Sequence, residues 1–303
     1  MNNRYPPPPA APQGYAPMPA DLPQHARERL AAMRQRRLFT SDLSVNEFLL
    51  IKEAGFEPLG LVMGSSVYQM MIGVPQLPYG TAGAEVAWMS HALYHSRQLA
   101  MTRMEEEADQ LGADGIVGVR LEVNVHAFGQ NILEFMAVGT AVKHAGAPGA
   151  FRNAQGKPFQ SDLSGQDFWT LVRAGYRPVG FCMGNCVAYV PPETVQTIEG
   201  SGSSGDNCEL SAYTHVMYDA RELAIGRLQH EAEALRAEGI VGVTVEEKEH
   251  SWGAGGVTGR RRDGNDALVS GELLELFVVG TAVVRYDGGN RLPPVTLAIP
   301  LDK

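Results

Sequence analysis

Three stretches of this chain occur twice, in the same order. They read Phe-x-Ser-Asp-Leu-Ser, then Ile-Val-Gly-Val, then Val-Gly-Thr-Ala-Val. A repeat with this spacing predicts two copies of one folded unit and argues against a single large domain. The stretches lie at 39–44 and 159–164, at 116–119 and 240–243, and at 138–142 and 279–283.

The repeat and the composition between its copies divide the chain into five segments. The first is a Pro-rich tail, expected to be disordered, followed by a short basic helix near 25–38. That helix is expected either to be a solvated lead-in or to dock on an acidic partner or a neighbouring subunit. An apolar stretch at 295–301 predicts that the last segment docks in an extended form on its own chain or a neighbour. The segments are 1–38, a first unit at 39–144, a linker at 145–158, a second unit at 159–286, and an extended tail at 287–303.

Charge and cysteine content narrow the class of protein. The net charge of -9 argues against a nucleic-acid binder, because such domains are usually basic. Three cysteines, all in the second unit, form no disulfide framework and predict a cytoplasmic protein. The chain start lacks a signal-peptide core, and the longest apolar run, near 59–74, is too interrupted to predict a membrane span.

Periodicity predicts the same elements in each unit: a short helix, a strand, a long helix and two strands. The long helices are expected over 84–111 and 209–235, because apolar residues recur there at spacings of three and four. At 1.5 Å per residue, the first would be roughly 40 Å long, too long for one small sheet to cover. A core of three strands and one helix is thin, so the units are expected to gain stability by association. The other elements of the first unit are expected over 45–53, 56–63, 115–128 and 132–143, and a strand of the second over 240–250.

The run Ala-Asp-Gly-Ile-Val-Gly-Val at 113–119 and the later Gly-Thr-Ala-Val strand resemble the YbjQ-like family, often labelled "putative heavy-metal-binding domain". The resemblance covers roughly 50–143 and 170–284. It implies an α+β fold of two tandem dodecin-like β-α-β-β units that form pentameric rings. The second copy has Arg236 where the first has Gly112, so its long helix is expected to close later, through Glu238 and Gly239.

Metal binding is one candidate chemistry, and a divalent transition metal is the cofactor that it would require. Two histidines four apart on the first long helix can reach one ion, and the second helix repeats the spacing with a histidine and an aspartate. The cysteines offer a soft-metal site, or act as buried apolar side chains. Both interpretations stay open. The candidate ligands are His91, His95, His215, Asp219, Cys182, Cys186 and Cys208.

Charged residues on the long helices are candidate interface residues. They can form surface ion pairs at i and i+4. Alternatively, Arg97 and Arg221, which lie in the apolar stripe, can be buried against carboxylates of another subunit, and this interpretation is favoured. The full set is Arg97, Arg103, Glu107, Arg221, Arg227 and Glu231.

Polar residues repeat on one face of a long strand in each unit. A carboxylate and a histidine four apart can line the lumen of a ring or serve acid–base catalysis. Sequence motifs for a nucleophile, an oxyanion hole or a phosphate loop do not accompany them. The candidates are Glu122, His126, Glu246 and His250.

The sequence therefore predicts a non-enzymatic protein that assembles with itself. Five chains are expected to build two pentameric layers, one from each copy, with a larger shell as an extension. A heavy-metal-binding module is the alternative, and an enzyme without a named substrate is the third. A partner protein for the N-terminal tail is also considered.

Overall fold

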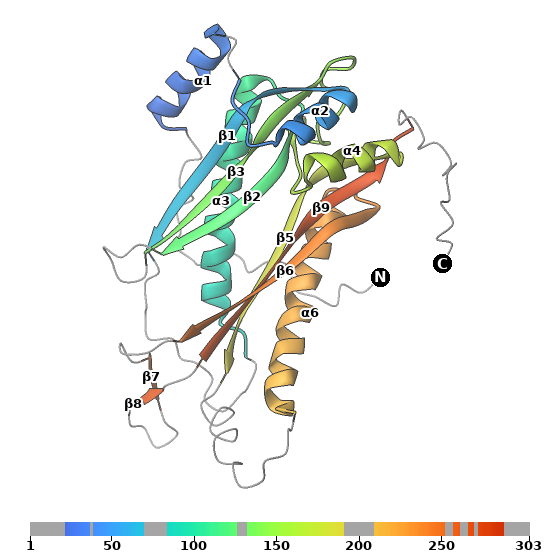
Figure 1. Ribbon diagram of the computed structural model, residues 1–303. Coiled ribbons are helices and arrows are strands. Elements are labelled where there is room, and N and C mark those ends of the chain that lie inside the picture. The colour runs from blue at the N-terminus through green and yellow to red at the C-terminus, as the bar shows by residue number, and fades with distance from the viewer. Residues whose placement is uncertain are drawn as a thin grey trace, which may run out of the picture.

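The computed structural model describes the chain over most of both units. The described residues are 22–36, 39–69, 84–125, 132–190, 209–251, 257–260, 266–269 and 272–287. Two α+β units lie side by side, as the repeat predicts (Figure 1). No helix in this part of the chain is long and apolar enough to cross a membrane.

Each unit contains one antiparallel three-stranded core sheet and one long helix. In the first unit, the sheet comprises β1 (Phe56–Gln69), β3 (Ile132–His144) and β2 (Gly115–Val125), in that order, with α3 (Ala87–Leu111). In the second unit it comprises β5 (Tyr176–Val190), β9 (Glu272–Arg285) and β6 (Gly239–Ser251), with α6 (Ser211–Ala234). The predicted β-α-β-β order is thus confirmed in both units.

The long helices pack closely on their sheets because a glycine lies under each. A Cβ atom on Gly64 would lie 2.1 Å from the carbonyl oxygen of Ala100, and one on Gly184 would lie 2.0 Å from that of Ala224. Only a residue without a side chain fits there. This contact explains the glycine that each copy carries just after the middle of its first strand.

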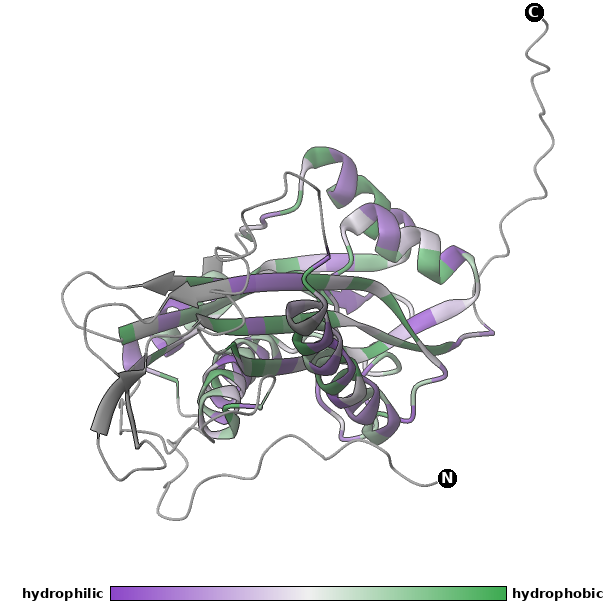
Figure 2. Cartoon of the chain, turned by 90° about the horizontal axis from the view of Figure 1, so that it is seen from below, coloured by the Kyte–Doolittle hydropathy of each residue, from purple (hydrophilic) through white to green (hydrophobic). Residues whose placement is uncertain are grey.

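Short helices cover the other side of the strands (Figure 2). Ser44 caps α2 (Val45–Glu53) in a capping box with Glu47, and Ser164 caps α4 (Gly165–Arg173). Thr140 donates a hydrogen bond of 2.5 Å to Asp42, and the second unit repeats this bond. The repeated Ser-Asp-Leu-Ser and Gly-Thr-Ala-Val stretches are therefore bonded partners. The remaining elements are α1 (Gln24–Arg36), β4 (Phe159–Gln160), β7 (Val257–Arg260) and β8 (Asp266–Val269).

The segment expected as a linker packs into a core that both units share. Phe151 is buried, and its ring meets the edge of the Phe56 ring at a centroid distance of 4.8 Å. Phe159 and Phe168 of the second unit join the same cluster. The two units therefore share buried aromatic surface instead of being joined by a free tether.

Three boundaries of the long helices differ from those predicted. The helices begin at Ala87 and Ser211, because Val86 and Leu210 before them have non-helical backbone angles. The expectation that the second helix closes through Glu238 and Gly239 is wrong: Arg236 itself adopts the left-handed conformation, with φ 56°, in the place of Gly112 with φ 73°. A non-glycine residue in this region carries a steric cost.

Candidate assembly interface

The first unit contacts the second through α3, which lies between the two sheets (Figure 1). Side chains alternate along β5, so Cys182 and Cys186 face α6, whereas Phe181 and Val187 join the core of the first unit. The second sheet is therefore covered on both faces, by a helix from each unit. We call this surface the inter-unit contact.

The residues before α3 add to the free edge of β5. Val86 donates its backbone N–H to the carbonyl of Val187 at 2.7 Å, and Tyr189 donates to the carbonyl of Ala84 at 3.0 Å. The Ser90 hydroxyl accepts the Val187 N–H at 2.9 Å. An unpaired strand edge is thus satisfied by the other unit.

A buried ion pair crosses the inter-unit contact. Arg97 Nη2 lies 2.5 Å from Glu275 Oε1, and both side chains are almost fully buried. Removing either partner would leave an uncompensated charge in the interior. The pair therefore fixes the position of α3 relative to β9.

A second ion pair crosses the contact with the charges reversed: here the first unit supplies the carboxylate and the second unit supplies the arginine. Glu85, which precedes α3, binds Arg227 of α6 through both carboxylate oxygens, at 2.7 and 3.0 Å. Arg227 also donates to the carbonyl of Asn185 at 2.6 Å, and Asn185 donates to the carbonyl of Ser90 at 2.9 Å. Bidentate geometry gives this pair a defined orientation.

The start of the second unit completes the contact by strand addition. β4 runs parallel to the edge of β2, with Phe159 opposite Gly115. A Cβ atom on Gly115 would lie 2.1 Å from the Phe159 ring, so the glycine makes room for it. Val119 donates to the carbonyl of Ser161 at 2.9 Å.

The structure brings part of the predicted interface set to this contact. Arg97 and Arg227 lie in it, but Arg103 donates to the carbonyl of Ser65 in its own unit at 2.6 Å. Arg221 has a side chain 42% exposed and lies 3.8 Å from Glu247. The remaining members, Glu107 and Glu231, accept the backbone N–H of Met63 and of Met183, at 2.9 and 2.7 Å.

The candidate metal ligands do not converge in the described residues, where no group of three or more ligands is present. The rings of His91 and His95 meet at 4.9 Å, and burial, with the neighbouring His95, lowers the pKa of His91. Burial raises the pKa of Cys182 and Cys186 to about 12. His215 and Asp219 are exposed on α6, and Cys208 lies outside the described residues.

The candidate ring-lining residues lie on β2 and β6 where the structure describes them. Glu122 and Glu246 are exposed, and Glu246 lies 3.4 Å from Lys248. His250 of β6 is paired with Leu273 of β9 in the sheet register. His126 lies outside the described residues. A ring lumen at this face remains a prediction.

Sequence reasoning missed Glu85, Glu275, Ser90 and Asn185, all central to the inter-unit contact. Their counterparts in the other unit, at matching positions, are Glu209, Glu134, Thr214 and Ser65. Both glutamates have a glutamate as counterpart, and the serine has a threonine. Asn185 is the exception, because its counterpart is a serine. This preserved chemistry was the available signal, but it became readable only once the contacts were known.

Comparison with known proteins agrees with the duplicated architecture. The family model described as "Putative heavy-metal-binding" (YbjQ) matches twice, at residues 55–145 and 203–285. The chain belongs to the YbjQ family. Its two matched regions show a tandem duplication of the YbjQ unit.

Relatives in the YbjQ family differ in length. A Mycobacterium tuberculosis protein named "Encapsulin nanocompartment protein Rv1762c" is 43% identical over 278 residues, 91% of this chain and 96% of its own length. A UPF0145 protein of Halorubrum lacusprofundi is 36% identical over 104 residues, 34% of this chain and 97% of its own. A UPF0145 protein of Fervidobacterium nodosum is 37% identical over 89 residues, 29% of this chain and 81% of its own. No solved structure matches the chain.

Proposed function

We propose that the protein is a non-enzymatic building block that assembles head to tail with copies of itself into a closed ring. One observation carries this proposal. The inter-unit contact is buried once within the chain, and the equivalent surfaces of the other two faces are left exposed. Residues that bury α3 on the second sheet have counterparts on the first sheet and on α6, and these counterparts are exposed. A second chain offers the matching surface.

Most of the exposed large apolar side chains follow this rule; Val45 and Leu49 of α2 do not. Val243 is 49% exposed, whereas its counterpart Val119 is 3% exposed. Val67 is 60% exposed, and its counterpart Val187 is fully buried. Exposed apolar patches of this kind mark interaction sites. The other exposed residues with buried or partly buried counterparts in the contact are Met63, Leu210, Tyr218 and Val245.

The charged residues of the inter-unit contact also have charged counterparts of the same sign at the equivalent positions of the other unit. Arg221 corresponds to Arg97, and the half-buried Glu134 corresponds to Glu275. Between two chains, Arg221 of one would meet Glu134 of the next. In the same way, Glu209 of one chain corresponds to Glu85 and would meet Arg103 of the next. Charge complementarity of this kind fixes the register of an interface.

Strand addition supplies a third, independent match. Phe39, the counterpart of the fully buried Phe159, is 45% exposed. Gly239, the counterpart of Gly115, is exposed, and its nearest neighbour to a built Cβ is Val283 at 3.9 Å. The open edge at Gly239 therefore has room for the Phe39 ring of the next chain. All three matches join the second unit of one chain to the first unit of the next.

A heterologous contact of this kind closes into a ring if its rotation closes. First and second units then alternate around one ring, which replaces the two separate layers expected from the sequence. Five chains, the number expected from the sequence, would contribute ten units to such a ring. The nanocompartment named for the Mycobacterium tuberculosis relative supports assembly, and a shell of such rings in the cytoplasm is the extension we favour.

Native mass spectrometry with charge-reversal variants tests the proposal. Wild type is expected at a multiple of the 32.7 kDa chain mass, five-fold for the pentamer. R221E and E134R should each lower the assembled fraction at least tenfold, and the double variant should restore it. E233R, which reverses an exposed charge elsewhere on α6, is the matched control. A monomeric wild type, or a double variant no better than the singles, contradicts the proposal.

The contact between the His91 and His95 rings supports a second candidate, a metal-binding module. Two imidazoles supply two of the ligands that a site needs, so further ligands must come from elsewhere. Elemental analysis of untagged protein decides this. A stoichiometric transition metal that is lost in H91A/H95A supports the metal module, and its absence removes it.

A further inference from the structure

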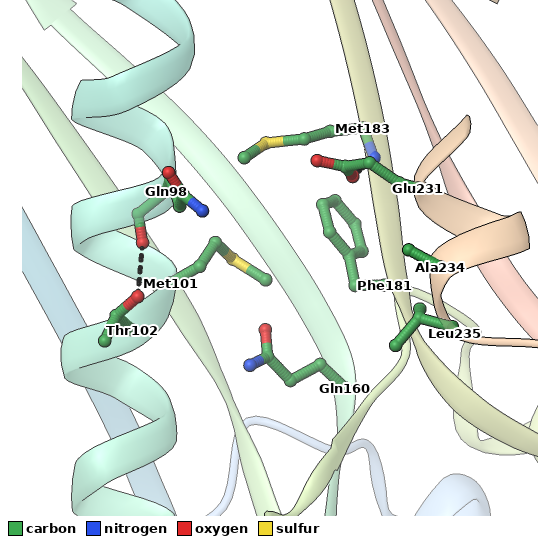
Figure 3. A pocket seen from close by; sticks show the side chains of 9 residues that line it. All are labelled: Gln98, Met101, Thr102, Gln160, Phe181, Met183, Glu231, Ala234 and Leu235. Atoms are coloured by element: carbon green, nitrogen blue, oxygen red, sulfur yellow. Dashed lines mark hydrogen bonds between the residues drawn. The ribbon is translucent and has the colours of Figure 1, made fainter. Parts of the chain in front are cut away.

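A cavity of about 280 Å³ lies where α3 of the first unit approaches β5 and α6 of the second (Figure 3). Its volume is just below the range of about 300–1,000 Å³ that is typical of ligand pockets. The assembly proposed above makes no use of it. Its lining residues are Gln98, Met101, Thr102, Gln160, Phe181, Met183, Glu231, Ala234 and Leu235.

Among the described residues, Glu231 is the one carboxylate that lines the cavity. One of its oxygens accepts the backbone N–H of Met183 at 2.7 Å. Burial raises the pKa of this carboxyl to about 8. No ion pair to this carboxyl is formed by the described residues, and Arg227, one turn before it on α6, is bonded to Glu85 instead.

The first unit shows what the equivalent carboxylate binds. Glu107, the counterpart of Glu231, accepts the N–H of Met63 in the same way and also forms an ion pair with Arg29 of α1. The Arg29 guanidinium donates in addition to the carbonyl of Leu61 at 3.3 Å. The second unit has the same carboxylate and strand, with Phe181 in the place of Leu61. The position that corresponds to the Arg29 guanidinium is occupied there by the cavity.

We infer that this cavity is a binding site for a guanidinium group. The carboxylate of Glu231 and the carbonyl of Phe181 repeat the two acceptors that hold Arg29. The Phe181 ring and the Met101 and Met183 side chains supply apolar and aromatic surface on which a planar cation stacks. Gln160 donates its amide N–H to Glu105 at 2.8 Å, which turns its amide oxygen away from Glu105 as a further acceptor.

Two properties distinguish this site from an adventitious contact. A planar guanidinium presents several donors in fixed directions, whereas an ammonium is a compact and strongly hydrated charge. The site should therefore prefer the guanidinium. Since Glu231 is largely protonated at pH 7, binding must also release a proton, and affinity must rise with pH up to about 8.

Isothermal titration of the full chain with butylguanidine tests the inference, with butylamine as the matched probe. Butylguanidine should bind at least tenfold more tightly than butylamine, and at least tenfold more tightly at pH 8.5 than at pH 6. E231Q should abolish both preferences, because glutamine keeps the bond to Met183 but carries no charge. E233Q, two positions along the same helix, should leave binding unchanged.

A capped Gly-Arg-Gly peptide identifies the source of the guanidinium. Equal or tighter binding than butylguanidine assigns the site to an arginine side chain of a protein, and binding at least tenfold weaker assigns it to a small molecule. Equal binding of butylguanidine to wild type and E231Q, or none to wild type, overturns the inference. Native mass spectrometry of E231Q keeps this outcome separate from a failure to assemble.

Discussion

Arg97 stacks on the ring of Phe277, with its guanidinium carbon 3.9 Å from the ring centroid. The arginine comes from the first unit and the phenylalanine from the second. Together with Glu275, the ring surrounds a charge that is 1% exposed. A buried cation that is paired and stacked in this way holds two units in one arrangement.

Arg97 and Arg221 occupy equivalent positions but should respond differently to substitution. R97M leaves Glu275 buried without its partner, and we expect it to lower the free energy of unfolding by about 3–5 kcal/mol. R221M removes one partner of a half-exposed ion pair. The free energy of unfolding of the dissociated chain should therefore change by less than about 1 kcal/mol. Urea unfolding at low protein concentration measures both, and equal losses would contradict the assignment.

Glu231 should make the protein less stable as the pH rises. Its pKa is raised to about 8 in the folded protein from an ordinary value of 4.5, so the folded state holds more protons between these values. The free energy of unfolding therefore falls as the pH rises through this range, and the loss reaches its full size above pH 8. E231Q removes it, and its stability advantage should be at least about 1.4 kcal/mol larger at pH 9 than at pH 5. Urea unfolding at both pH values provides the measurement; a constant difference argues against the raised pKa.

Arg236 should be a site where glycine stabilises the protein. Its φ of 56° lies in the left-handed region, which costs a non-glycine residue roughly 1 kcal/mol. R236G should therefore raise the melting temperature. G112A, at the equivalent position of α3, should lower it. Differential scanning calorimetry of both variants gives the comparison, and a destabilised R236G would show that the arginine side chain makes a compensating contact.

Cys182 and Cys186 should resist thiol reagents while the protein is folded. Both are fully buried, and burial raises the pKa of each thiol to about 12, so almost no reactive thiolate is present at pH 8. In a C208S background, reaction with a chromogenic disulfide should proceed at the rate of unfolding. Addition of urea should then release two thiols per chain. Fast labelling without urea contradicts this expectation.

Much of the fold was predictable because the two copies could be compared. The helix over Val45–Glu53 lies at its expected residues, and the first long helix ends at Leu111, as expected. These elements depend on local signals, namely caps and apolar periodicity, which a single sequence carries.

The contact between the units was not predictable in the same way. Glu85 and Glu275 are separated in sequence from their partners, and neither belongs to a periodic pattern. The extended residues before α3 appear helical by composition but pair with the edge of β5 instead. Tertiary hydrogen bonding overrides local preference there. The cavity beside Glu231 depends on the absence of a second α1, which no local signal reports.

Contacts within a chain and contacts between chains alternate around the proposed ring. Because two units share one chain, the contacts within each chain form while that chain folds. Dilution can open only the contacts between chains, since the inter-unit contact is intramolecular and has no concentration dependence. A ring that dissociates therefore yields two-unit pieces with their shared aromatic core intact. Assembly and folding can then be weakened independently, one through Arg221 and the other through Arg97.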